Sequence, residues 1–289
     1  MEVGVIMGRE VRKMLNKKIV NIFLKYFILL LMTAMFLFPL LFMLSTSVKS
    51  INEIFTKSFH LIPRVFHFEN YANALKTIPY LKYAWNTLFI TVLNVVGQLL
   101  ISPMVAYSLS KVDWIGKRVV FVVLLSTMLL PYQVTMIPVY IIWSNLGLVG
   151  SYVPLILPAF FGYAFYIIIL RQFFMTIPDS ILESARIDGA SEFRIYWNIM
   201  LPLCKPALIA VAIFTFMFTW SDFLGPLIYL TKQDKYTLAL GLQQYLSQHT
   251  VAWEQLMAAS TMFTMPIIII FFFAQRKFIE GVVTTGLKG

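Results

Sequence analysis

The sequence predicts an all-α membrane protein with six transmembrane helices, and two observations carry that prediction. Hydrophobic residue types make up 60% of its 289 residues and charged types only 12%, whereas soluble domains are about half apolar and about a quarter charged. No water-soluble fold of this size could bury so much apolar surface. The apolar residues also gather into runs of about 20, the length that a helix needs to cross a bilayer.

Six apolar runs follow one another along the chain, and each is long enough for one helix. The third contains two prolines, Pro131 and Pro138. Neighbouring helices in a membrane can satisfy the backbone groups that a proline frees, so these residues predict a kink or break within the span. The runs cover about Val20–Leu44, Asn86–Leu109, Val119–Ile142, Val153–Phe174, Pro206–Leu230 and Leu256–Ala274.

The positive charges indicate the orientation of the helices. The net charge is +10, but Lys and Arg are spread through the loops of an apolar chain, so nucleic acid is not expected as a partner. With the N-terminus inside, 15 of the 23 Lys and Arg fall in inner segments and 7 in outer ones. Cytoplasmic loops carry such an excess. Both termini and the loop at 175–205 are therefore expected in the cytoplasm.

The sequence does not show the residue patterns of common active sites. A single cysteine, Cys204, and three histidines without ligand spacing predict no metal centre. No phosphate-binding loop of the form G-x-x-x-x-G-K-(S/T) occurs in the sequence. We therefore expect a protein that is not an enzyme and that binds no cofactor itself.

The loop between the fourth and fifth runs is unusually polar and predicts two short helices. Pro178 ends the fourth helical region, and Asp179 or Ser180 is suited to cap a new helix. Gly189 tolerates a positive φ and is expected to end that helix, and Ser191 is suited to cap the next one. Small residues around the bend would let another backbone approach closely.

Two interpretations of this loop stay open on physical grounds alone. The helix–glycine–helix element is either a linker that lies in the headgroup region or a docking surface for a cytoplasmic partner. In its second helix an i, i+3, i+4, i+7 spacing predicts one amphipathic face, made of Phe193, Tyr196, Trp197 and Met200.

The same loop resembles a known sequence motif. It reads Glu183-Ser184-Ala185-x-x-Asp188-Gly189-Ala190 and resembles the E-A-A-x-x-D-G-A motif of binding-protein-dependent ABC importer permeases. Ser184 stands where that family usually has alanine, but both residues are small. Segments such as FTWSDFLGPLIYL and PYQVTMIPVYIIWSNLGLVGSY are similar to the carbohydrate-uptake branch, close to the maltose-type second permease subunit. The similarity covers about Tyr71–Gly289.

The resemblance implies a fold and a set of partners. The fold is that of a type I ABC importer permease in the cell or inner membrane of a prokaryote. A transmembrane domain at 20–277 lies between cytoplasmic segments at 1–19 and 278–289. The implied partners are a second homologous permease, two cytoplasmic ATPase subunits, an extracytoplasmic solute-binding protein and a carbohydrate. ATP and magnesium would be bound by the ATPases, and this chain would form half of the translocation pathway.

The resemblance also assigns the polar loop as a coupling helix that sits in a cleft of one ATPase. Glu183 would be its charged contact and Gly189 its point of closest approach, and the loop at 183–202 would transmit the movement of the ATPases. The implied coupling residues are Glu183, Ser184, Ala185, Asp188, Gly189 and Ala190.

Six other residues are candidates for the translocation pathway. The two on the second run lie four residues apart and share a face, although hydrogen bonding between helices is an alternative role for them. The one acidic candidate lies toward the outer end of the fifth run, where it lines the pathway or sits at the membrane surface. Aromatic rings hold sugars, but most aromatic residues of such a chain face lipid. The candidates are Asn94, Gln98, Tyr132, Gln133, Tyr163 and Asp222.

Two alternatives to a sugar importer stay open. One is an ABC permease for a non-sugar solute, and the other is a self-sufficient secondary transporter. Ionisable groups in the middle of the spans would favour a secondary transporter, and the six runs hold almost none. The outer segment Thr231–Gln255 is expected either to reach into the solute-binding protein or to be a solvated loop.

Overall fold

The structure, a computed structural model, describes residues 2–56, 60–246 and 251–286. Within these ranges the regular secondary structure is helical, and no β-strand is formed. The described chain divides into two compact units. One is made of residues 1–73 with 252–261, and the other of residues 74–251 with those from 262 onward.

The first unit begins with the long helix α1 (Glu2–Ser47). Its segment Lys18–Ser47 is long and apolar enough to cross a membrane. None of the most apolar 18-residue stretch of this segment is buried by the rest of the described chain. The first unit therefore leaves these apolar side chains uncovered.

Polar contacts hold the segment that follows α1, which contains α2 (Ile51–Ile54) and leads to α3 (Glu69–Thr77). The Asn70 side-chain amide donates to the carbonyls of Ser47 and Lys49, at 3.0 and 2.9 Å. The Lys49 side chain is buried and donates to a backbone carbonyl of the same unit. The turn after α1 is thus fixed by side chains that bond to the main chain.

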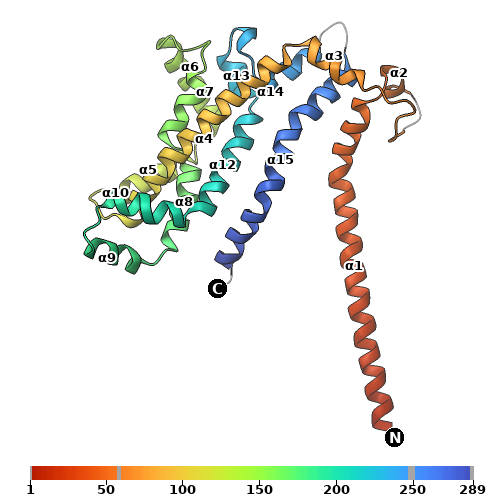
Figure 1. Cartoon of the computed structure of the whole chain (residues 1–289), viewed down its shortest axis with the longest axis horizontal. Coiled ribbons are helices and arrows are strands. Elements are labelled where there is room, and N and C mark those ends of the chain that lie inside the picture. Colours follow the sequence, from red (N-terminus) through yellow and green to blue (C-terminus); the bar gives the residue numbers. More distant parts are fainter. Residues whose placement is uncertain (1, 57–59, 247–250, 287–289) are drawn as a thin grey trace. The chain divides into compact units, whose positions relative to one another are not determined.

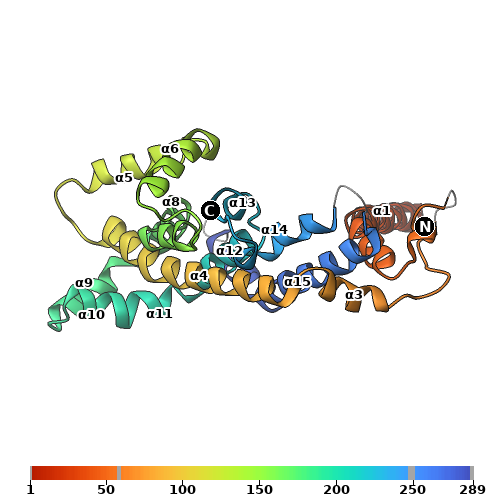
Figure 2. The same ribbon diagram turned by 90° about the horizontal axis from the view of Figure 1, so that it is seen from above.

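The second unit is built around α4 (Tyr80–Lys111), a helix of 32 residues. At 1.5 Å per residue it is about 48 Å long. Two helices, α8 (Ala164–Met175) and α12 (Lys205–Trp220), pack along it (Figure 1). Figure 2 shows α8 between α4 and the pair α5 (Lys117–Thr127) and α6 (Tyr132–Asn145).

Different short elements lie at the two ends of α4. At the Lys111 end are α9 (Asp179–Ile187) and α10 (Glu192–Ile195), and α14 (Leu238–Leu242) packs near the Tyr80 end. The remaining elements are α7 (Val153–Ile156), η1 (Leu157–Phe161), η2 (Tyr196–Met200), α11 (Leu201–Leu203), α13 (Leu224–Tyr229), η3 (Gln233–Lys235), η4 (Gln243–Tyr245) and α15 (Trp253–Gly286).

The described residues hold four segments that could cross a membrane singly, and up to six if each of two bent pairs counts as one span. One pair is α5 and α6, which meet at 101°. Pro131 comes directly before α6, so the predicted break in the third run is confirmed. The other pair bends by 77° between Glu192–Leu203 and Lys205–Trp220.

Hydropathy predicted one continuous helix for the fifth run, but the structure divides this run into two helices. The helix α12 ends at Trp220, and α13 begins only at Leu224. At the C-terminus, the tail predicted at 278–289 is helical as far as Gly286, and its last three residues lie outside the described ones.

The main apolar core of the second unit lies near the Lys111 end of α4. It joins α4, α8, α9, α10 and α12. Its fully buried members include Leu170, Phe174, Ile195, Met200 and Cys204. Burial of one such side chain stabilises a fold by about 1.5–3 kcal/mol in water, so this cluster holds the polar loop firmly against the helices.

Candidate functional site

The first helix of the polar loop, α9, starts without the predicted side-chain cap. Its N-cap residue is Pro178, which makes no capping hydrogen bond. The prediction that Asp179 or Ser180 caps the helix is therefore wrong. Asp179 lies in the first turn of α9 and its carboxylate instead pairs with Lys111, because a stronger, charge-assisted partner is within reach.

The bend and the second helix form as predicted. Gly189 has a φ of +80°, in the region that residues other than glycine rarely adopt. The amide of Ala190 donates to the carbonyl of Ala185 at 3.0 Å, which closes the end of α9. Ser191 caps α10 by accepting from the amide of Arg194 at 3.4 Å.

The motif residues present an open and charged outer surface. Glu183, Ser184, Asp188 and Gly189 are exposed, and Ala185 and Ala190 pack partly against the core. In the part of the chain that the structure describes, no heavy atom lies within 4 Å of a Cβ built on Gly189, apart from its chain neighbours. No hydrogen bond or ion pair engages the carboxylates of Glu183 and Asp188 within the described residues.

The second helix does not show the single amphipathic face that its spacing predicted. Tyr196 and Met200 are buried, whereas Phe193 and Trp197 are 66% and 55% exposed and stack on each other with ring centroids 6.3 Å apart. Residues 196–200 form a π-helical turn, which is wider than an α-helical turn. Positions three apart therefore lie on different faces, whereas positions four apart share a face: Phe193 with Trp197 outside and Tyr196 with Met200 inside.

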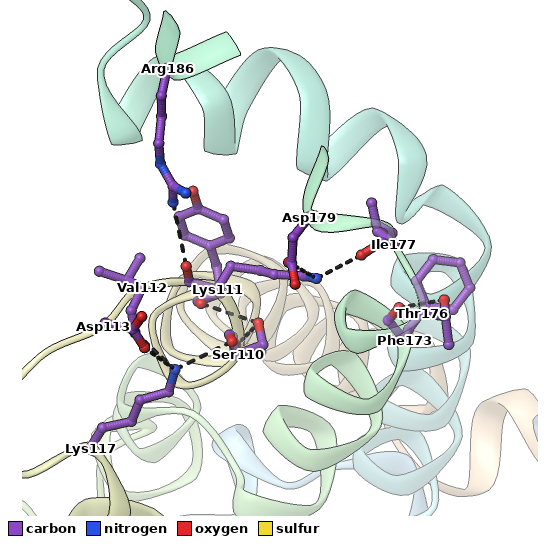
Figure 3. A network of polar contacts seen from close by, with 12 residues as sticks. Ser110, Lys111, Val112, Asp113, Lys117, Phe173, Thr176, Ile177, Asp179 and Arg186 are labelled. Atoms are coloured by element: carbon purple, nitrogen blue, oxygen red, sulfur yellow. Dashed lines mark hydrogen bonds and ion pairs between the residues drawn. The ribbon is translucent and has the colours of Figure 1, made fainter. Parts of the chain in front are cut away.

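A buried lysine joins the loop to the end of α4. The Lys111 ammonium donates to the Ile177 carbonyl and to the Asp179 carboxylate, both at 2.6 Å. Figure 3 shows it between these two acceptors. The Lys111 side chain is only 5% exposed. Its hydrogen bond, and then its charge, lower the pKa of Asp179 below the ordinary value.

Three more contacts extend this network to both helices of the loop. Arg186 on α9 donates to the Glu192 carboxylate at 2.7 Å. It also donates to the Lys111 carbonyl at 3.4 Å (Figure 3). The Tyr107 hydroxyl on α4 donates to the other oxygen of the Glu192 carboxylate at 2.5 Å. We call Tyr107, Lys111, Asp179, Arg186 and Glu192 the α4 clamp.

The sequence offered little sign of the α4 clamp. Lys111 and Arg186 counted there only among the inner positive charges, and Glu192 only as a polar residue of the loop. The contacts that reach α4 join positions 66 to 85 residues apart. Charged residues so far apart in the sequence leave no local pattern. The only signal was that Lys111 follows an apolar run, at the end expected on the same side of the membrane as the loop.

A cavity of about 500 Å³ lies in the second unit, toward the Tyr80 end of α4. Its walls come from α4, α6, α13 and the segment Pro154–Tyr163, and they are mainly apolar and aromatic. Four of the six pathway candidates line it, namely Asn94, Tyr132, Tyr163 and Asp222. It was not predicted that Trp143 and Tyr229 also line it.

The other two pathway candidates lie elsewhere. Gln98 is fully buried and bonds the Ala159 carbonyl at 3.1 Å through its amide, while its oxygen accepts from Ser102 and the amide of Tyr163. This is the helix-to-segment hydrogen bonding named as its alternative role. Gln133 is exposed and does not line the cavity among the described residues.

Asp222 has a structural contact as well as a place in the cavity wall. Its carboxylate accepts from the amide of Gly225 at 3.0 Å, across the turn that separates α12 from α13. A Cβ on Gly225 would lie 2.4 Å from the other carboxylate oxygen. The turn therefore depends on this Asp–Gly pair.

Metal ligands do not come together in the part of the chain that is described. No group of three His, Cys, Asp or Glu side chains there is arranged to hold a metal ion.

Most of the sequence matches a known family. The family described as binding-protein-dependent transport system inner membrane component matches residues 98–283, which is more than half of the chain. The chain belongs to this family of ABC transporter permeases. It is therefore a membrane transport subunit and not an enzyme. The match includes all of the Glu183–Ala190 motif and starts after Asn94.

Individual relatives cover nearly all of this permease. The arabinooligosaccharides transport system permease protein AraQ of Bacillus subtilis (strain 168) is 34% identical over 263 residues, covering 90% of this chain and 93% of AraQ. The probable starch degradation products transport system permease protein AmyC of Thermoanaerobacterium thermosulfurigenes is 31% identical over 280 residues, covering 95% and 100%.

A solved structure shares the fold of this permease. One chain in the crystal structure of a bacterial ABC transporter involved in the import of the acidic polysaccharide alginate superposes with a TM-score of 0.79 at 28% identity. The superposition covers 88% of this permease and 94% of that chain. The mostly helical architecture with four to six apolar spans is thus that of an ABC importer permease.

Proposed function

We propose that this permease carries a sugar or oligosaccharide inward as half of the translocation pathway of an ATP-driven importer. The names of AraQ and AmyC, which point to arabinooligosaccharides and starch degradation products, support the substrate class. The cavity supports it too, because aromatic rings and a few hydrogen-bonding groups such as those of Asn94 and Asp222 suit a neutral, hydroxyl-rich solute.

The loop at 183–202 is the coupling element of the importer. The observation that carries this assignment is the outer surface of α9: unpaired Glu183 and Asp188 carboxylates beside Gly189, with open space around it. A cleft on an ATPase subunit with a basic contact could receive this surface. The apolar core and the α4 clamp both hold α9 against the helices. A displacement of α9 therefore moves these helices as well, and the loop does not deform alone.

The proposed topology has six spans, with α5–α6 counted as one and the fifth made of α12 and α13. Both termini and the coupling loop face the cytoplasm, as the excess of Lys and Arg in the inner segments indicates. The permease lies in the inner or cell membrane of a prokaryote. The cavity then lies toward the external side, where a solute-binding protein would deliver its sugar.

The proposed assembly contains two ATPase subunits and a second homologous permease. The sequence has no phosphate-binding loop, so ATP and magnesium belong in the ATPases. The family name itself states dependence on a binding protein. The exposed apolar surface of α1 provides area for lipid or for the second permease.

Two substitutions in the coupling loop test this assignment. Glu183→Arg reverses a free charge, and Gly189→Trp fills the space around the bend. We expect each to abolish sugar uptake into vesicles by the complete importer, while the chain still inserts into the membrane. Uptake that persists with either variant would contradict the assignment.

Gly189→Asn is the matched control for the second variant. Asparagine tolerates a positive φ better than other residues with side chains, and it is much smaller than tryptophan. If close approach is what matters, this variant should keep a large part of the uptake. Equal loss in both variants would show that only the backbone conformation had been tested.

A further inference from the structure

The long helix α4 touches both the coupling loop and the cavity. Its Lys111 end bears the α4 clamp, and its other half places Thr87, Ile90 and Asn94 in the cavity wall. The two regions lie on one helix of 32 residues, which stays helical through Pro103 between them. Because α4 also packs along α8 and α12, it can carry a displacement from one end to the other.

Away from its Lys111 end, α4 is bonded directly to the segment that forms part of the cavity wall. The Asn94 amide donates to the Leu155 carbonyl at 2.9 Å. Gln98 bonds the Ala159 carbonyl at 3.1 Å and accepts from the Tyr163 amide at 3.1 Å. The Gln98–Ala159 bond is buried and the other two are partly buried. Together they tie α4 to the segment that carries Leu155 and Tyr163, both of which line the cavity.

The two backbones also approach closely at this level. A Cβ on Gly97 would lie 2.9 Å from the Phe160 ring and 3.2 Å from the Ala159 carbonyl carbon. Packing this tight leaves no room for α4 to slide past the wall. A movement of α4 must therefore move the wall with it.

At the Lys111 end of α4, the attachment to the coupling loop depends on one side chain more than on the others. Lys111 is the only clamp member whose side chain reaches both the link before α9 and α9 itself, through Ile177 and Asp179. Nearby Lys117 makes a different set of contacts. It bonds Ser110 on α4 and Val112 and Asp113 in the link between α4 and α5, and none of these three bonds reaches α9.

We propose that Lys111 is a positioning residue that makes the coupling loop and α4 move as one body, so that α4 transmits the movement of the loop to the cavity. This inference rests on the proposed function, because it takes the loop to be the part that an ATPase moves. Lys111 is not proposed to contact the sugar or the ATPase. Its role is to prevent the loop from turning independently of α4.

The test is the number of sugars moved per ATP hydrolysed by the complete importer in proteoliposomes. For Lys111→Met we expect this ratio to fall at least about tenfold, while ATP hydrolysis stimulated by the loaded binding protein stays within about twofold of wild type. Lys117→Met, the matched control, should leave the ratio unchanged. An unchanged ratio in Lys111→Met would overturn the proposal, and so would parallel loss of hydrolysis and uptake.

A second measurement follows the movement itself. The natural Cys204 is fully buried, so spin labels can be placed at Ser180→Cys on α9 and Met104→Cys on α4, both exposed positions. With Lys111 present, the distance between the labels should be the same in nucleotide-free and ATP-bound importers, and in Lys111→Met it should differ. A distance that changes in the presence of Lys111 would overturn the proposal.

Other variants separate this proposal from the proposed function. If Lys111→Met does not assemble, Asp179→Asn weakens the same contact from its exposed end and is judged by the same ratio. If Glu183→Arg leaves uptake intact, the coupling assignment itself fails. If Glu183→Arg abolishes uptake but the Lys111 and Asp179 variants keep the ratio, the role of α4 fails alone.

Discussion

Single side chains in this permease fix features that hydropathy does not encode. Asp222 is the clearest case, because its carboxylate caps the turn between α12 and α13 by accepting from the Gly225 amide. Lys111 is another, since its buried ammonium joins two elements that lie far apart in the sequence. In both cases one polar group bonded to the main chain decides where a helix begins or what it is attached to.

Gly225→Ala should destabilise the second unit. The added Cβ would meet a carboxylate oxygen of Asp222 at 2.4 Å and the Leu155 side chain at 3.1 Å, so Asp222 must rotate away and lose its bond to the amide. We expect a loss of about 1–3 kcal/mol, measured as a lower melting temperature of the purified permease in detergent. The neighbouring exposed Ser221→Ala should change stability by less than about 0.5 kcal/mol.

The Asp179–Lys111 pair should be insensitive to pH in the working range. The Lys111 hydrogen bond lowers the pKa of Asp179 below 3.8, its ordinary value. A carboxyl with a lowered folded-state pKa stabilises the fold above its unfolded pKa, and this contribution is lost only as pH falls through the lowered value. The ratio of sugar moved to ATP hydrolysed should therefore be flat from about pH 5 to pH 8. A transition inside that range that disappears in Asp179→Asn would contradict the assignment.

At the scale of helices, the sequence predicts whatever is encoded locally. The break at Pro131, the end of α9 at Gly189 and the cap at Ser191 depend on the conformational preferences of one residue, and all three were predicted correctly. The break after Trp220 was missed because Ser221 and Asp222 form a turn through a side-chain contact to Gly225 that has no hydropathy signature.

Packing decides the features that local patterns misjudge. The spacing of Phe193, Tyr196, Trp197 and Met200 predicted one face, but the π-helical turn divides them between core and surface. The pathway candidates show the same limit. Their residue types could be chosen from the sequence, whereas only the packing of α4, α6 and α13 separates those that line the cavity from Gln98 and Gln133.

For the whole molecule, the family follows from the sequence better than the mechanism does. The motif at Glu183–Ala190 and the apolar runs predicted an ABC importer permease, and the family match confirms it. The identity of the sugar leaves no comparable pattern, because a cavity lined by aromatic and apolar side chains accepts many neutral solutes. Measuring which sugar the cognate binding protein retains would define the substrate.

The purified permease alone should hydrolyse no ATP above background. The sequence has no phosphate-binding loop, so hydrolysis requires the separate ATPase subunits. The measurement is phosphate release by the permease in detergent with magnesium and ATP, with the reconstituted importer as the positive control. Robust hydrolysis that co-purifies with this chain and survives removal of contaminating ATPases would refute the proposed division of labour.

The uncovered apolar stretch of α1 has a consequence for biosynthesis. Its own unit does not bury it, so its stability in the bilayer depends on its own length and composition. This helix is thus able to insert before the helices of the second unit have been made. It would hold the growing chain at the membrane while the helices that form the cavity are still being made.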